Sequence, residues 1–303
     1  MPALAFTKKA YWLCLVFLTL SLLFFWTKTI TDRTYEQSKE REAIYEKTFG
    51  TLPLETKIAY VYDLTDERAI YAKNEKILAP LASFTKLMTT VVVFENISKN
   101  STITLSDDAL STEGEYGLVV GEKWRASDLA RFMLIASSND AAHALELATA
   151  SPASFVSAMN RKSAELGLSM HFKNETGLDL ETAEESAFGS AEDSVKLFAY
   201  ALKTYPDILS ATGHPSLTVT SESGTVHTVD NTDPILASLP SPIASKTGYT
   251  LRAGGNLLVA FSLEGHTIIT CVLGSSQDGR FSDTLALAYA SELYFSDLRA
   301  HGL

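Results

Sequence analysis

Residues 256–273 read NLLVAFSLEGHTIITCVL, and this stretch restricts the fold that the chain can adopt. Two apolar runs of strand length flank Glu264-Gly265, a typical turn pair, so the stretch predicts an antiparallel hairpin. Residues 57–72 predict a second hairpin, because KIAYVYDL is followed by the polar turn TDER and then by AIYA. Strands therefore lie near both ends of the globular part of the chain.

The segments between these hairpins have helical spacing of their apolar residues. The predicted helices cover residues 84–95, 127–136, 140–150, 154–166 and 191–202, and a further helix over residues 284–294 follows the second hairpin. Terminal strands with helices inserted between them favour a mixed α/β (α+β) fold. We expect an antiparallel sheet flanked by helices, an all-helical subdomain, and a functional cleft where the two meet.

The composition excludes several functional classes. The 303 residues include 25 Lys and Arg against 36 Asp and Glu, which gives a net charge of −11, and 46% of them are hydrophobic. Such a chain folds, and its negative surface disfavours a nucleic-acid partner. The two cysteines, Cys14 and Cys271, are not expected to pair, and no Cys/His spacing predicts zinc. We therefore expect no metal and no cofactor.

The N-terminal region contains a candidate membrane segment. Residues 10–26 read AYWLCLVFLTLSLLFFW without a charge, with Lys8 and Lys9 before them and Lys28 after them. As a helix this run covers ~25 Å, and flanking lysines can extend it to a full span. No small-x-small site follows the apolar run, which favours a retained anchor over a cleaved signal sequence.

These features predict a domain order and an orientation. We expect a cytoplasmic tail at residues 1–9, a transmembrane anchor at 10–30, a polar stalk at 31–56 and the main domain at 57–303. The positive charges at the N-terminal flank place the main domain outside the cytoplasm, in the periplasm or at the cell surface.

Ser83-Phe84-Thr85-Lys86 opens the first predicted helix of the main domain, and it is the only Ser-x-x-Lys in the chain. On a helix, Ser83 and Lys86 share one face. Free N–H groups at a helix start can stabilise a developing oxyanion, so Ser83 is a candidate nucleophile. The alternative is that Ser83 is an ordinary N-cap residue and Lys86 an ordinary surface lysine.

Two further motifs follow Ser83-Phe84-Thr85-Lys86 along the chain, and the order of the three motifs supports a functional interpretation of each. Ser137-Ser138-Asn139 interrupts two apolar helices, so its polar groups must find partners inside the fold, although a plain turn gives the same pattern. Lys246-Thr247-Gly248 lies on a predicted strand and offers a cation, a hydroxyl and close backbone approach to a carboxylate. Taken alone, this motif also fits an exposed strand edge that carries a lysine.

In this order the three motifs resemble the penicillin-binding serine D,D-peptidases. The longer stretches ASFTKLMTTVV, GLVVGEKWRASDLARFMLIASSNDAAHALE, FVSAMNRKSAELGL, NETGLD and SKTGYTLRAGGNLLVAF are similar to the low-molecular-weight D-alanyl-D-alanine carboxypeptidases, peptidase family S11. The resemblance covers residues 57–295. It implies a serine β-lactamase/D,D-peptidase-like fold, peptidoglycan stem peptides as substrates and β-lactams as covalent inhibitors.

The resemblance also implies roles for particular residues. Ser83 would be acylated, Lys86 would take its proton and Ser137 would relay a proton to the leaving amine. The resemblance further implies a substrate-binding set, which is Asn139, Lys246, Thr247, Gly248, Tyr249 and Arg252. Within this set Asn139 holds the substrate amide, Lys246 and Thr247 bind the terminal carboxylate with help from Arg252, and the backbone N–H groups of Ser83 and Tyr249 form the oxyanion hole.

The chain departs from the family pattern in three places. Ser138 replaces the usual glycine of the middle motif, and Thr176 replaces the histidine of a His-Gly-Leu stretch, so no role of that histidine carries over. Many relatives also continue into a β-rich domain and an amphipathic membrane helix, whereas this sequence ends at Leu303. We expect the N-terminal segment to provide the membrane tether instead.

The base must be a lysine if the six histidines are structural or exposed, as their scattered positions indicate. Lys86 would then need a pKa roughly 2–3 units below its usual value of about 10.4, through burial and repulsion from Lys246. A class A β-lactamase is less favoured, because no glutamate between Glu146 and Glu222 has an asparagine four residues later. A D,D-endopeptidase and a penicillin sensor remain open alternatives.

Overall fold

The structure is a computed structural model that describes residues 3–114, 116–149, 151–179 and 186–303. The chain divides into two compact units. The first comprises residues 1–51 and 293–303, and the second comprises residues 52–292. Each unit is described by itself.

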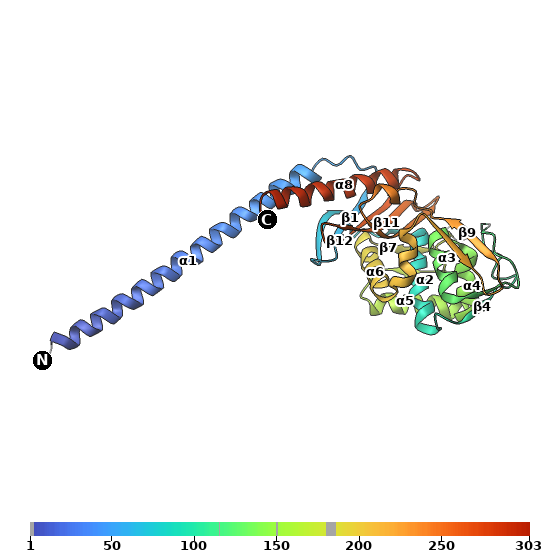
Figure 1. Cartoon of the computed structure of the whole chain (residues 1–303), viewed down its shortest axis with the longest axis horizontal. Helices are drawn as coiled ribbons and strands as arrows, with labels where there is room; N and C mark the ends of the chain where they lie inside the picture. Colours follow the sequence, from blue (N-terminus) through green and yellow to red (C-terminus); the bar gives the residue numbers. More distant parts are fainter. Residues whose placement is uncertain (1–2, 115, 150, 180–185) are drawn as a thin grey trace. The chain divides into compact units, whose positions relative to one another are not determined.

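The first unit is built on helix α1 (Ala3–Phe49), which runs without a break through the predicted span and most of the predicted stalk (Figure 1). Its apolar part is long and hydrophobic enough to cross a membrane. Near its C-terminal end Phe49 is buried and its ring lies 5.7 Å from that of Tyr294, while Lys47 forms a 2.8 Å ion pair with Asp297. These contacts hold the end of α1 against the last residues of the chain.

The second unit is organised by a five-stranded antiparallel sheet with the order β10-β11-β12-β1-β2. Its strands are β1 (Ile58–Asp63), β2 (Arg68–Lys73), β10 (Pro242–Thr250), β11 (Gly254–Leu263) and β12 (His266–Ser275). Strand β1 pairs with β12, so the two ends of the domain sequence meet in the middle of the sheet. This pairing leaves β10 at one edge.

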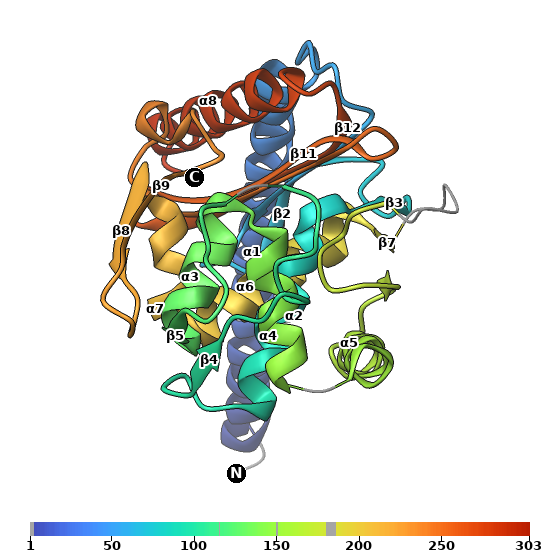
Figure 2. The ribbon, with the colours of Figure 1, turned by 90° about the vertical axis from the view of Figure 1, so that its right-hand side faces the viewer.

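Both faces of the sheet are covered, which explains why β11 and β12 are apolar at nearly every position. Successive side chains point to opposite faces. Leu258 and Cys271 join the large hydrophobic core shared with the helices, whereas their neighbours Leu257 and Val272 are buried on the other face. Figure 2 shows the sheet between α8 (Gly279–Ala300) and the helices on its opposite side.

The helices between the strands form the remainder of the second unit. They are α2 (Thr85–Asn96), α3 (Ala126–Ala136), α4 (Asn139–Thr149), α5 (Pro152–Glu165), α6 (Ala191–Thr204) and α7 (Pro206–Leu209), with the 3-10 turns η1 (Ala82–Phe84), η2 (Ser210–Gly213) and η3 (Leu236–Ser238). The short strands are β3 (Ala79–Pro80), β4 (Thr102–Thr104), β5 (Lys123–Arg125), β6 (His171–Phe172), β7 (Ala187–Gly189), β8 (Ser216–Thr220) and β9 (Val226–Asp230). Helix α2 is buried along most of its length and contacts α4, α5 and α6.

The structure confirms both predicted hairpins, the five internal helices and the mixed fold class, whereas the region expected to be all-helical also contains the short strands β3 to β9. Helix α8 begins earlier and ends later than the predicted residues 284–294. One predicted boundary falls on Ala150, which lies outside the described residues. The division of the N-terminal helix into span and stalk stays a prediction.

Candidate active site

Ser83 lies in turn η1, immediately before the buried helix α2. The backbone enters this turn through Ala82, which has a φ of +47°, a left-handed conformation that is costly for a residue with a side chain. Ser83 is half-buried, and its Oγ accepts a 3.0 Å hydrogen bond from Lys86 Nζ. Ser83 therefore neither begins α2 as a cap nor faces bulk solvent freely.

Lys86 is fully buried, and its amine donates three hydrogen bonds. The acceptors are Ser83 Oγ at 3.0 Å, Asn139 Oδ1 at 2.8 Å and the carbonyl of Thr176 at 2.7 Å. Burial lowers the pKa of Lys86 to about 7, and the negative charge of Glu175 partly opposes that shift. A large fraction of Lys86 is therefore neutral near pH 7 and able to accept the proton of Ser83.

Ser137 and Asn139 come from the turn that joins α3 to α4. Ser137 has a φ of +55°, so the chain reverses there in a left-handed conformation. Between them, Ser138 Oγ accepts a 3.1 Å hydrogen bond from the N–H of Ala141 and caps α4. Asn139 Nδ2 donates to the carbonyl of Glu113 at 2.8 Å and to Tyr116 Oη at 3.1 Å, which fixes its oxygen toward Lys86.

Lys246 reaches this group from the edge strand β10. Its Nζ donates to Ser137 Oγ at 2.9 Å and to the carbonyl of Thr247 at 2.8 Å. Burial, followed by the charges of Lys86 and Arg280, holds the pKa of Lys246 well below its usual value. The expected repulsion from Lys246 is not among the causes that lower the pKa of Lys86, which burial lowers, whereas repulsion from Lys86 does lower the pKa of Lys246.

Gly248 allows β10 to approach the turn that carries Ser83. A Cβ at this position would lie 3.1 Å from the carbonyl oxygen of Leu81 and 3.3 Å from the backbone nitrogen of Ser83. These separations are tighter than most real contacts of a Cβ, so a side chain would push the strand away from Ser83. The structure thus brings Ser83, Lys86, Ser137, Asn139 and the Lys-Thr-Gly strand together.

Two predicted residues lie at the margin of this group. Tyr249 follows Gly248 on β10 and its side chain is exposed, which leaves only its backbone for the expected oxyanion role. Arg252 is exposed on the turn between β10 and β11, and its help with the substrate carboxylate stays a prediction.

Some residues of the site are not evident from the sequence. Arg280, at the start of α8, is buried and donates a 2.7 Å hydrogen bond to the carbonyl of Gly248, while its Nε has no partner in the described part of the chain. Thr232 Oγ1 lies 2.6 Å from Thr247 Oγ1. Thr176 contributes its backbone carbonyl, so the loss of the family histidine at this position does not remove a contact to Lys86.

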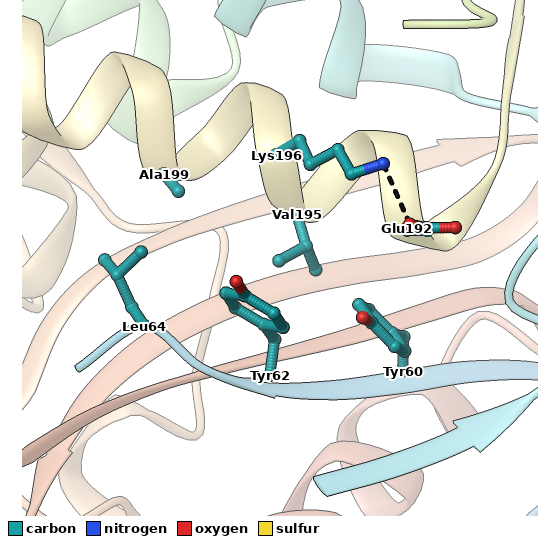
Figure 3. Close-up of a pocket in the computed structure, with 7 residues that line it drawn as sticks. All are labelled: Tyr60, Tyr62, Leu64, Glu192, Val195, Lys196 and Ala199. Carbon is teal, nitrogen blue, oxygen red and sulfur yellow. Dashed lines mark ion pairs between the residues drawn. The ribbon is translucent and has the colours of Figure 1, made fainter. Parts of the chain in front are cut away.

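A separate pocket of about 290 Å³ lies between β1 and α6. Figure 3 shows Tyr60 and Tyr62 on its floor and the Glu192–Lys196 ion pair at 2.8 Å on the facing helix. Strand β1 is separated from β10 by β11 and β12, so this pocket is distinct from the group around Ser83.

The histidines fit their predicted structural roles in several cases. His227 Nε2 lies 2.7 Å from Glu122 Oε1 and its ring packs on Trp124, while His266 Nδ1 lies 2.9 Å from Asp63 Oδ2. The hydrogen bond that Ser83 Oγ accepts comes from Lys86 Nζ, so Lys86 is the base available to it. A serine paired with a neutral buried lysine defines an active-site-serine acyl-transfer centre.

Comparison with known proteins supports this class. The model of the D-alanyl-D-alanine carboxypeptidase family, peptidase family S11, matches residues 46–277, which is more than half of the chain. The chain therefore belongs to this family.

Individual relatives are similar over most of the second unit. The carboxypeptidase DacF of Bacillus subtilis is 30% identical over 239 residues, which is 76% of this chain and 60% of that protein. A D-alanyl-D-alanine endopeptidase of Haemophilus influenzae is 29% identical over 206 residues, or 65% of this chain and 68% of that protein. The chain thus spans less than two thirds of the length of DacF.

Among solved structures, penicillin-binding protein D2 of Listeria monocytogenes in its ampicillin-bound form superimposes with a TM-score of 0.70 and 30% identity. The match covers 81% of this chain and 99% of that one. The predicted resemblance to the S11 carboxypeptidases and the predicted D,D-peptidase fold are confirmed.

Proposed function

We propose that the chain is a serine D-alanyl-D-alanine carboxypeptidase that removes the terminal D-alanine of peptidoglycan stem peptides. The observation that carries this proposal is the pair of hydrogen bonds Lys86 Nζ to Ser83 Oγ and Lys246 Nζ to Ser137 Oγ, at 3.0 and 2.9 Å. The first pair supplies a nucleophile with its base. The second supplies a hydroxyl and an amine on the side where a leaving group needs a proton.

In the acylation step, Ser83 Oγ attacks the carbonyl carbon of the penultimate D-alanine while neutral Lys86 takes the hydroxyl proton. The backbone N–H groups of Ser83 and Tyr249 stabilise the oxyanion that develops. When the C–N bond breaks, Ser137 relays the proton held by Lys86 to the leaving amine of D-alanine, so that Lys86 becomes neutral again and Ser137 keeps its hydroxyl. Water then attacks the ester while Lys86 takes its proton, and that proton passes to Ser83 Oγ as the shortened peptide leaves.

Lys246, Thr247 and Asn139 bind the substrate in this scheme. The substrate carboxylate pairs with Lys246 and Thr247, and Asn139 holds the substrate amide while its oxygen orients Lys86. The low pKa of Lys246 is consistent with this role, because an arriving carboxylate favours the protonated amine. Binding of the substrate then compensates a charge that burial otherwise disfavours.

The same nucleophile opens the amide of a β-lactam ring, so we expect penicillins to acylate Ser83. The test is labelling with a fluorescent penicillin, with Ser83→Ala beside the matched control Ser98→Ala. Ser98 is exposed in a polar loop. We expect Ser83→Ala to remove labelling and the release of D-alanine, and Ser98→Ala to retain both. Wild-type release of D-alanine by Ser83→Ala would refute the proposal.

Mass analysis of digested peptidoglycan separates the two peptidase activities found among the relatives. A carboxypeptidase shortens pentapeptides by one alanine, whereas an endopeptidase converts cross-linked dimers to monomers. We expect the first result. A protein that labels with penicillin but does not release D-alanine promptly would instead be a penicillin sensor.

We further infer that α1 stays attached as a membrane anchor with the second unit outside the cytoplasm. The charge-free run at residues 10–26 and the lysines before it support this orientation. An N-terminal tag retained in the membrane fraction, and digestion of the second unit by protease added outside intact protoplasts, are the expected results. Release of an untagged soluble form would indicate a cleaved signal sequence.

A further inference from the structure

A second buried cluster lies beyond Lys86, on the side of α4 and the loop that follows β6. His143 and Glu146 are three residues apart on α4, and Glu175 reaches them from the loop. His143 Nδ1 lies 3.0 Å from Glu146 Oε2 and 3.0 Å from Glu175 Oε1. One atom from each side chain lies within 4.8 Å of the other two, so the three groups face a common point.

The charges of this cluster are not balanced by the protein. Glu146 and Glu175 are buried, and among the described residues no lysine or arginine forms an ion pair with either carboxylate. A single Nδ1–H can satisfy only part of two carboxylates. The second oxygen of Glu146, Oε1, is buried with no hydrogen-bond partner in the described structure.

A second cluster of His and Asp side chains in the second unit has its negative charge compensated by an arginine. Asp63, Asp66 and His266 also place ligand atoms within 4.8 Å of one another. There Arg68 lies 3.8 Å from Asp63 and 3.4 Å from Asp66, and two backbone N–H groups donate to Asp63. An arginine thus supplies the positive charge that the cluster around His143 lacks.

We propose that His143, Glu146 and Glu175 form a binding site for one divalent zinc ion. A neutral imidazole and two carboxylates carry a charge of −2, which Zn²⁺ cancels. One nitrogen and two oxygens are ligands that zinc accepts, with a water molecule in the fourth position. No metal is needed for the proposed acylation step, so this site is an addition to that function.

The geometry is close to what zinc requires. Bonds of 2.0–2.2 Å in a tetrahedral arrangement separate neighbouring ligand atoms by roughly 3.3 Å. The two observed separations of 3.0 Å therefore need to open by only a few tenths of an ångström. Glu146 Oε1 can serve as a second oxygen for the ion, and the side chain of His143, which is 17% exposed, gives access from solvent.

The proposed zinc site is connected to the active site by the backbone, because one of its ligands is next in sequence to a residue that contacts Lys86. Glu175 precedes Thr176, whose carbonyl accepts the 2.7 Å hydrogen bond from Lys86. The carbonyl of Glu175 itself accepts a 2.6 Å hydrogen bond from Thr89 on α2. A zinc ion bound to Glu175 would tie the loop to α4 and hold these two carbonyls in place.

The test measures zinc directly on the full chain in detergent after removal of metal with EDTA. We expect titration calorimetry and elemental analysis to give one Zn²⁺ per chain, bound at least 100-fold more tightly than Mg²⁺, which prefers six oxygen ligands. His143→Gln and Glu146→Gln should each lose this binding. His266→Gln, in the arginine-balanced cluster, is the matched control and should retain it.

Fluorescent-penicillin labelling in EDTA shows that each variant is folded, because labelling requires an intact Ser83 and Lys86. Zinc binding that persists in both His143→Gln and Glu146→Gln would overturn the proposal. So would the absence of stoichiometric zinc in the wild-type protein, since His143 would then serve as an imidazolium shared by two carboxylates. Loss of zinc binding in variants that still label with penicillin supports the site.

Discussion

The group around Lys86 and the cluster around His143 are two buried charged regions of the second unit. In the first, burial lowers the pKa of Lys86 to about 7. In the second, burial, followed by repulsion from Glu175, raises the pKa of Glu146 to about 7. Burial thus favours the neutral form of both the Lys86 amine and the Glu146 carboxyl, because neither charge is fully compensated by a partner of opposite sign.

Paired groups elsewhere in the second unit behave differently. Lys162 forms ion pairs with Glu95 at 2.6 Å and with Glu165 at 3.0 Å, and these partners raise its pKa. Lys86 has hydrogen-bond acceptors but no carboxylate in contact among the described residues. The comparison indicates that the pKa of Lys86 is low because Lys86 is buried without a contacting carboxylate, at a cost in stability that other parts of the fold must offset.

The largest expected effect comes from replacing Lys86 with a cation that cannot lose its proton. Lys86→Arg should lower the rate of acylation by penicillin and by peptide at least ~10³-fold, because a guanidinium stays charged at pH 7. Stopped-flow acylation kinetics measure this rate. Lys76→Arg, at an exposed lysine, is the control and should leave the rate unchanged. Substantial activity in Lys86→Arg would mean that another group accepts the proton.

Lys246→Gln should have a smaller effect that depends on the substrate. Loss of the cation should lower kcat/KM for a peptide with a free terminal carboxylate by about 10- to 100-fold. A peptide with an amidated terminus already lacks that interaction, so the variant and the wild type should differ less on it. Equal losses on the two peptides would contradict the assignment of Lys246 to the carboxylate.

Glu146→Gln tests whether the buried cluster around His143 makes the stability of the folded protein depend on pH. The folded protein raises the pKa of Glu146 from 4.5 to about 7, so ionisation of this group costs stability progressively as the pH rises through that interval. In EDTA, we expect the variant to be more stable than the wild type by on the order of 2 kcal/mol at pH 8 and to lose that advantage near pH 4. Thermal unfolding at the two pH values measures the difference.

The control for this measurement is Glu222→Gln, at an exposed glutamate, which should change stability little at either pH. A Glu146→Gln protein with the same stability difference at both pH values would show that packing, not ionisation, separates it from the wild type.

The smallest expected effect concerns the electrostatic interaction between the cluster around His143 and Lys86. The charge of Glu175 raises the pKa of Lys86, so Glu175→Gln should shift the pH midpoint of acylation downward. In EDTA, the wild-type rate should rise with pH through about 7 as Lys86 loses its proton, and the variant should reach its plateau at lower pH. An unchanged midpoint would show that the two regions are electrostatically independent.

Much of the fold could be predicted because its signals are local. Apolar stretches of strand length around the turns of the hairpins at 57–72 and 256–273, and helical spacing between the hairpins, depend only on neighbours in the sequence. Short motifs likewise identified Ser83, Lys86, Ser137, Asn139 and the Lys-Thr-Gly strand. The structure brings these residues together as the motifs predicted.

Other features of the site had no local signal. Arg280 supports Gly248 from a helix 32 residues further along the chain, and Thr176 contributes a backbone carbonyl that any residue could provide. The left-handed conformations of Ala82 and Ser137 occur at residues that do not favour them. Only packing around the turns explains why the chain adopts them.

The sequence by itself predicted the two hairpins of the main sheet, the helices between them, the apolar N-terminal helix and the residues proposed as nucleophile and base. The tertiary structure alone decided that Lys86 is fully buried beside Asn139 and Thr176, and that Glu175 meets His143 and Glu146. Burial and long-range approach are properties of the packed chain, because the free energy of a charge depends on all the groups that surround it in space. A sequence motif specifies only the few residues next to it along the chain.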